Sequence, residues 1–124
     1  MDKKRPKHLD LSQIKLPLPA LVSILHRISG VLLFLTFPLL LLMLQYSLRS
    51  IETYTQLFGL LHHPLIKLVL LGLLWASLHH ICSGVRYLAI DMDWGVRLAR
   101  ARASSKWVVI ASLSLTVLTG VWLW

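Results

Sequence analysis

Histidine and arginine side chains stand at the ends of two long apolar stretches of the sequence. His26 and Arg27 open the first stretch, and His79, His80 and Arg86 lie near the end of the second. Ionisable residues inside membrane helices are costly, so they usually serve a function there. A neutral imidazole is a good ligand for haem iron, and cationic side chains suit the carboxylates that a haem carries. These residue types therefore predict a binding site, with haem or a quinone as its ligand.

The composition requires a membrane around this site. The chain has 124 residues, of which 56% are hydrophobic and 15% charged, and its mean hydropathy is +0.71. Soluble domains carry roughly 25% charged residues. Three segments free of formal charge are long enough to cross a bilayer, which takes roughly 20 apolar residues. We therefore predict an all-α integral membrane protein with helices at about 21–48, 64–88 and 106–124.

The distribution of basic residues sets the predicted orientation. Two groups of lysines and arginines, one before the first span and one between the second and third, place both segments in the cytoplasm of a bacterial inner membrane. The net charge of +8 is thus a topology signal, and we expect no nucleic-acid partner. We divide the chain into a cytoplasmic basic lead, 1–20, and a membrane domain, 21–124. The connection at 49–63 is expected to be a short, mildly polar loop, partly at the membrane interface.

Antiparallel packing of the first two spans would bring the polar residues together at the cytoplasmic end. Ser23, Arg27 and Gly30 share one helical face, and a Ser–Arg pair there can hydrogen-bond a quinone carbonyl. Arg27 equally suits a side chain that snorkels to lipid phosphates. Helical geometry does not decide whether His79 or His80 would bind the iron. The haem and quinone interpretations both stay open on spacing alone.

The stretches RPKHLDLSQIKLPLPALVSILHRISG and HHICSGVRYLAID closely resemble the cytochrome b subunit of succinate dehydrogenase. The resemblance is to this membrane anchor in its proteobacterial form, and it covers nearly the whole chain. Two motifs carry it, S-x-x-H-R-x-[ST]-G in the first span and H-x-x-x-G-x-R in the second. Either motif alone is weak, but both at this separation are specific.

The resemblance implies a role for each matching residue. His80 matches the axial ligand of the haem b iron, and Ser23 and Arg27 match the quinone-binding serine and arginine. His26 and Arg27 match groups near the haem propionates. No catalytic residue for succinate is implied on this chain. The sequence departs from the family at Tyr87, where a histidine is common.

The function that the resemblance implies is electron transfer in respiratory complex II. The chain would be the membrane-anchoring haem b subunit of a succinate:quinone oxidoreductase of the tricarboxylic acid cycle. Its partners would be a flavoprotein subunit that oxidises succinate, an iron–sulfur subunit that passes electrons on to ubiquinone, and a second, small membrane anchor. This small anchor would complete the helical bundle and supply the second haem histidine, so that haem b is shared.

Other functions remain open. The chain could anchor a quinol:fumarate reductase that runs the reaction in reverse, or it could be a structural anchor without haem. A small transporter or channel is a third alternative. A transport pathway would need polar groups through the full membrane, whereas here they cluster at one side and the outer halves of the first and third spans are nearly all apolar.

Overall fold

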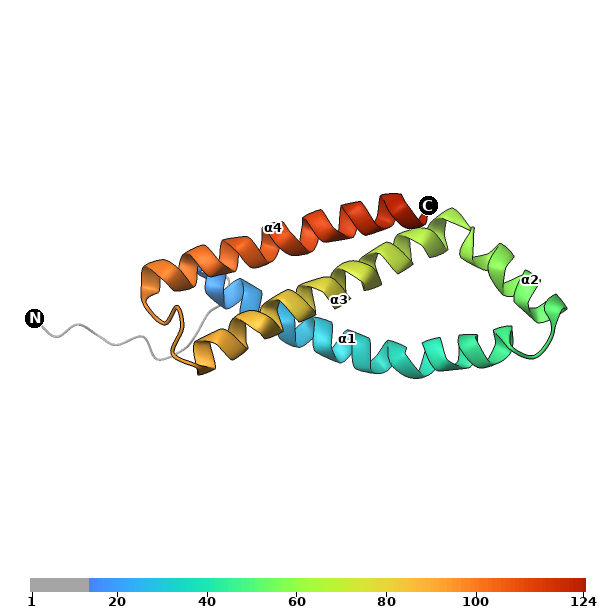
Figure 1. Cartoon of the computed structure of the whole chain (residues 1–124), viewed down its shortest axis with the longest axis horizontal. Coiled ribbons are helices and arrows are strands. Elements are labelled where there is room, and N and C mark those ends of the chain that lie inside the picture. Colours follow the sequence, from blue (N-terminus) through green and yellow to red (C-terminus); the bar gives the residue numbers. More distant parts are fainter. Residues whose placement is uncertain (1–13) are drawn as a thin grey trace, which may run out of the picture.

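A computed structural model describes residues 14–124, and in this part the chain is helical with no strand (Figure 1). Residues 1–13 of the predicted basic lead lie outside the described residues. The helices are α1 (Leu18–Ser47), α2 (Ile51–Leu61), α3 (Pro64–Asp91) and α4 (Leu98–Leu123). α1, α3 and α4 are long and apolar enough to cross a membrane. The predicted all-α, three-span membrane architecture is therefore confirmed.

Local sequence signals explain where the helices start. Pro64 stands at the first position of α3, where its missing N–H costs nothing, and the His63 Nδ1 accepts a hydrogen bond of 3.3 Å from the Leu65 N–H. Ser50 and Thr53 form a reciprocal capping box at the start of α2. These caps satisfy backbone donors that no earlier turn can reach.

The helices depart from the sequence-based expectation in several places. α1 starts at Leu18, within the predicted 1–20 lead, and α3 continues to Asp91, whereas helices were expected at about 21–48 and 64–88. The connection expected as a loop at 49–63 contains α2, because its capping box and apolar residues favour a short helix. The helix of the third span starts at Leu98 and not near residue 106. Charges mark the edge of the apolar segment, but helix formation does not stop there, since the preceding LARARASSK stretch is rich in helix formers.

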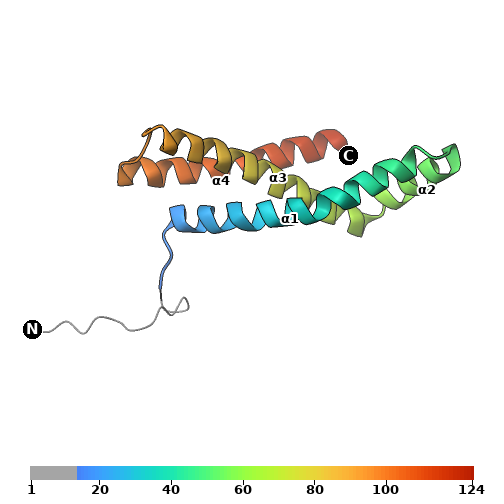
Figure 2. The ribbon, with the colours of Figure 1, turned by 90° about the horizontal axis from the view of Figure 1, so that it is seen from below.

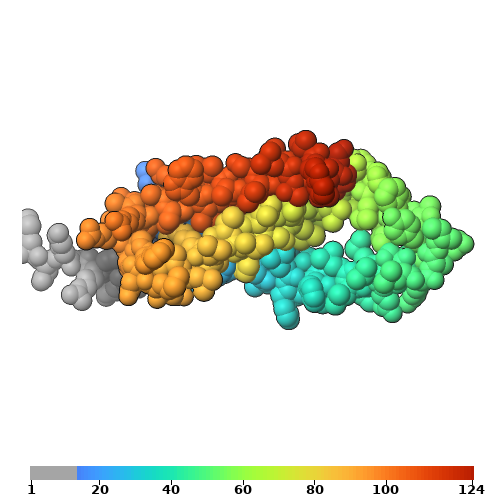
Figure 3. Space-filling model, in the orientation of Figure 1, coloured from blue at the N-terminus to red at the C-terminus, as the bar shows by residue number. Residues whose placement is uncertain are grey.

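The long helices form two contrasting contacts. α3 and α4 lie side by side along their length, as the space-filling view shows (Figure 3). The start of α1, the end of α3 and the start of α4 lie at one end of the molecule (Figure 1), which we call the cytoplasmic end after the predicted topology. α1 crosses α3 in this half and then diverges from it, and α2 connects the end of α1 back to the start of α3 (Figures 1 and 2). The cytoplasmic ends of α1 and α3 therefore lie together, while the outer half of α1 has little of this chain beside it.

The buried residues are mostly small or polar. This is typical of membrane bundles, in which small side chains allow helices to approach closely. A Cβ atom on Gly120 of α4 would lie 2.9 Å from Leu71 Cδ2 of α3, so a larger residue at position 120 would require the Leu71 side chain to shift. The buried members among the described residues are Val22, Ser29, Ala76, His79, Ser83, Arg86, Ser105, Val108, Ser112 and Gly120.

Candidate functional site

The His80 imidazole is held by two oxygen atoms of α1. Its Nδ1 lies 3.1 Å from the His26 carbonyl oxygen and 3.0 Å from Ser29 Oγ. A carbonyl oxygen can only accept, so this contact is a hydrogen bond when Nδ1 carries the proton, and we assign the proton to Nδ1 on that ground. Nε2 then has a free lone pair, and none of the hydrogen bonds among the described residues uses it. This tautomer is the one in which a histidine binds a metal through Nε2.

Packing fixes the plane of the same ring. A Cβ atom on Gly30 would lie 2.9 Å from His80 Cε1, so the α1 backbone approaches the imidazole closely only because residue 30 is glycine. The His26 ring stacks on the His80 ring with centroids 4.2 Å apart and planes 14° from parallel. Hydrogen bonds and packing together orient the imidazole before any ligand binds.

The polar cluster continues from His80 toward the cytoplasmic end of α3. The Tyr87 ring lies 5.2 Å from the His26 ring, and a Cβ atom on Gly84 would lie 3.8 Å from His26 Nε2. The Tyr87 hydroxyl is buried and has no hydrogen-bond partner within the part of the chain that the structure describes. The α1–α3 crossing thus brings His26, His80 and Tyr87 into one cluster.

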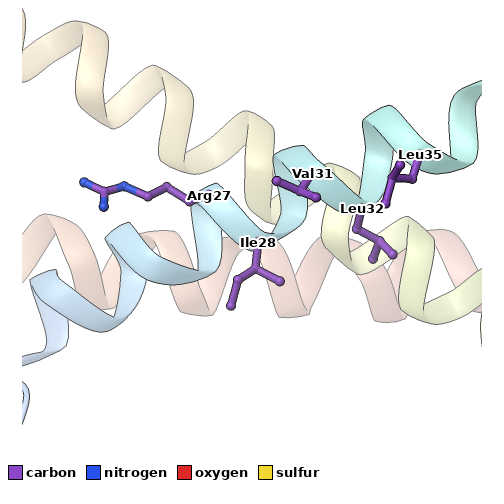
Figure 4. Close-up of a pocket in the computed structure, with 5 residues that line it drawn as sticks. All are labelled: Arg27, Ile28, Val31, Leu32 and Leu35. Atoms are coloured by element: carbon purple, nitrogen blue, oxygen red, sulfur yellow. The ribbon is translucent and has the colours of Figure 1, made fainter. Parts of the chain in front are cut away.

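Ser23 and Arg27 lie on a more open part of α1. Ser23 is half-buried and Arg27 is exposed. Arg27 stands at one end of an open groove of about 380 Å³, whose other lining residues are Ile28, Val31, Leu32 and Leu35. Figure 4 shows the guanidinium pointing away from these apolar side chains, toward the start of α1. An apolar groove with one cationic end suits a ligand that has a polar head and an apolar body.

Arg86 lies apart from that groove. Its side chain is only 8% exposed. Nε donates to Ser104 Oγ at 2.9 Å, and Nη2 donates to the Ala101 carbonyl oxygen at 3.3 Å. The guanidinium carbon lies 5.2 Å from the centre of the Tyr87 ring. Arg86 therefore joins α3 to the start of α4 and does not extend into the lipid.

The structure separates the two adjacent histidines. His79 is 1% exposed, and its Nε2 lies 3.2 Å from Ser83 Oγ one turn later. Its ring lies 5.3 Å from the Trp75 ring, and Nδ1 has no partner among the described residues. His79 thus faces the interior of this chain, whereas His80 lies half-buried at the α1–α3 crossing.

Ser29 and Ser104 were not singled out as partners in the sequence. Ser29 stands within the first motif, three residues after His26, and its hydroxyl donates to the His26 carbonyl at 2.8 Å. That i, i+3 spacing predicts a bond from Ser29 to the His26 carbonyl oxygen, which is the oxygen that His80 also contacts. Ser104 belongs to a serine pair in a basic stretch, and only the packing of α3 against α4 shows its role.

Comparisons with known proteins show the family of the chain. The family described as succinate dehydrogenase/fumarate reductase transmembrane subunit matches residues 1–119. A succinate dehydrogenase cytochrome b556 subunit of Coxiella burnetii is 40% identical over 100% of both chains. The subunits of the same name from Rickettsia felis and Paracoccus denitrificans are 33% and 30% identical, over 95% and 93% of this chain and 92% and 88% of theirs. The chain therefore belongs to the succinate dehydrogenase/fumarate reductase transmembrane subunit family, as a multi-pass cytochrome b anchor of the bacterial inner membrane.

Proposed function

We propose that this chain binds haem b and ubiquinone in a succinate:quinone oxidoreductase and helps electrons pass from the iron–sulfur subunit to the quinone. One observation carries the proposal. The His80 Nδ1 donates to the His26 carbonyl oxygen, which leaves Nε2 as an oriented ligand atom beside the membrane interior. The relatives bear the name cytochrome b556, which fits a haem ligand at this place.

The donor set of the chain fits half of a haem site. A haem with two axial histidines needs one imidazole on each face of the porphyrin. The His26 and His80 rings stack directly at 4.2 Å, which leaves no room for a porphyrin between them. This geometry excludes His26 as the second ligand of the same iron. As the family resemblance implies, we assign the second ligand to a histidine of the small membrane anchor of the complex. His26 and Arg27 would hold the propionates, as the resemblance implies. A bound haem would supply a one-electron store.

Ser23 and Arg27 would serve the quinone. The Ser23 hydroxyl can donate a hydrogen bond to a quinone oxygen, and the Arg27 charge favours the negative charge that develops on that oxygen during reduction. Arg27 stands at the cytoplasmic end of its apolar groove, so the polar ring of a quinone would lie near the side from which electrons and protons arrive. Succinate itself is oxidised in the flavoprotein subunit.

The haem assignment is tested by the haem content of the purified complex, measured as pyridine haemochrome. We expect His80→Ala to remove essentially all haem b because it deletes the ligand atom. His62→Ala is the matched control, since His62 lies at the outer membrane side and bonds only the Phe58 carbonyl among the described residues. Full haem content in the His80 variant would refute His80 as the haem ligand. A native complex that contains no haem would instead favour the alternative of a structural anchor without haem.

The quinone assignment is tested with two electron acceptors. Arg27→Gln and Ser23→Ala should lower succinate–ubiquinone reductase activity by about 10-fold or more, the loss expected when a positioned charge or hydrogen bond is removed. Succinate oxidation by a soluble artificial acceptor should stay unchanged. Equal losses with both acceptors would indicate failed assembly and contradict a quinone role. Comparing the two reaction directions in the same preparations separates succinate oxidation from the fumarate reductase alternative.

A further inference from the structure

A groove lies at the outer end of α3 and α4, opposite the haem-side cluster. It has a volume of about 710 Å³. The end of α4 lies beside the start of α3 here (Figure 1). Most of the wall is apolar. The lining residues are Lys67, Leu71, Thr116, Val117, Gly120, Val121 and Trp124.

Lys67 supplies the only formal side-chain charge in this groove. Its side chain is half-buried, and Nζ lies 5.8 Å from the centre of the Trp124 ring. The sequence contains no aspartate or glutamate from residue 53 to residue 90, or after residue 93. Glu52 lies in the first turn of α2, at the end far from α3, and the Ser50 side chain lowers the pKa of its carboxyl. No acidic side chain of this segment therefore neutralises Lys67.

The position of Lys67 in its helix also favours binding of an anion beside it. Lys67 lies in the first turn of α3, where the helix dipole is positive and disfavours a cation. An anion beside the Lys67 ammonium would interact favourably with the ammonium and with the positive end of the α3 dipole. Lys67 and Trp124 stand at the ends of two candidate membrane spans, so the predicted topology puts them at the membrane–water boundary, which is the level of lipid phosphates.

The rest of the groove suits a hydrocarbon chain. Gly120 has no side chain, so its backbone forms a floor that Leu71 contacts, and Val117 and Val121 are exposed along the same helix. Thr116 Oγ1 already donates its proton to the Ser112 carbonyl oxygen at 2.7 Å. Lys67 is therefore the donor left for the polar part of a ligand.

We propose that this groove binds a phospholipid of the outer leaflet, with its phosphate on the Lys67 ammonium and one acyl chain along Leu71, Val117 and Val121. A phosphodiester matches the Lys67 cation, which shares the groove with no acidic side chain, and an acyl chain matches the apolar part of the groove. A quinone would bring no negative charge. An apolar partner helix would bury Lys67 without a counter-ion, which is costly. The proposal does not depend on the haem or quinone assignments.

The test counts the phospholipid that the complete complex retains. The complex is exchanged into detergent, reloaded from phosphatidylglycerol vesicles and measured by native mass spectrometry. We expect Lys67→Gln to weaken retention about fivefold, the worth of one cation near an anionic lipid, and Lys67→Arg to restore it. Val117→Trp should block the acyl lane. Arg49→Gln, which removes a cation at the same membrane side outside the groove, should have no effect.

Three results would overturn the proposal. Equal lipid retention in the native, Lys67→Gln and Val117→Trp complexes would show that the groove holds no phospholipid. Retention of quinone or of a partner polypeptide in the groove, seen by photocrosslinking at position 117, would assign it to another occupant. In the native complex, diacylglycerol that competes as well as phosphatidylglycerol would show that the phosphate is not recognised. An unchanged haem spectrum serves as the folding control for each variant.

Discussion

The cytoplasmic and outer halves of this chain are held together in different ways. In the cytoplasmic half, His80 is fixed by two oxygen atoms of α1, and Arg86 by two oxygen atoms of α4. In the outer half of α1, apolar side chains face outward, and Phe34 is 79% exposed. The outer contact between α3 and α4 rests on Gly120 against Leu71.

This difference reflects the membrane as a solvent. Lipid tails are as apolar as leucine, so burying leucine between helices gains little there. Hydrogen bonds and close backbone contacts give a membrane bundle its specific geometry. The cytoplasmic half, which must orient the His80 imidazole, has both hydrogen bonds between helices and a close backbone contact at Gly30. The outer half of α1 keeps an apolar surface that suits lipid or a partner subunit.

The largest effect is expected at Gly30. Gly30→Val would place side-chain atoms where His80 Cε1 lies, and overpacking of this kind costs about 1–3 kcal/mol. We expect haem content per complex to fall severely, since the imidazole or α1 must shift. Gly59→Ala in α2 is the control, because a Cβ atom there meets nothing within 4 Å. Normal haem content in Gly30→Val would show that the cytoplasmic half does not depend on this close contact, and would contradict the proposed difference between the two halves.

A smaller effect on haem content is expected at Arg86, where the loss falls on stability. Arg86→Gln removes hydrogen bonds from a charged donor to Ser104 and Ala101, each worth about 1.5–3 kcal/mol. The complex should inactivate at a lower temperature, while the position of the haem α-band stays unchanged. A shifted α-band at native thermal stability would instead place Arg86 in the haem site.

The smallest effect is expected at Ser29. Ser29→Ala removes one of two acceptors of the His80 Nδ1–H, and the His26 carbonyl remains. Loss of such an outer hydrogen bond typically lowers metal affinity about 10-fold or more. Haem should remain bound in the native membrane but dissociate more readily in detergent, with a changed midpoint potential in a redox titration. Identical potential and retention would show that Ser29 does not tune His80.

Much of the fold could be predicted because charge-free length and basic flanks suffice to place membrane helices. The start of α4 at Leu98 could not be predicted in this way. Charged residues mark the edge of the apolar segment, but the helix continues through them. α2 was also missed, because a capping box in a short polar connection looks like a turn. These errors concern residues near the membrane surface, where hydropathy no longer dictates structure.

The candidate site was predictable in its residue types but not in its contacts. Antiparallel spans sufficed to bring the start of α1 near His79 and His80. Which of the two faces α1 depends on helix rotation, and adjacent residues differ by about 100° around the axis. The role of Ser29 likewise depends on the close approach that Gly30 allows. The haem, propionate and quinone roles of the named residues stay predictions.

The most direct test of the central claim compares His79→Gln with His80→Gln in the purified complex by a reduced-minus-oxidised optical spectrum. The two positions are adjacent, but His79 lies inside the chain and His80 presents Nε2 at the α1–α3 crossing. Succinate oxidation with an artificial acceptor controls for assembly. We expect the b-type α and Soret bands to persist in His79→Gln and to vanish in His80→Gln. Bands that persist in His80→Gln and vanish in His79→Gln would contradict the account.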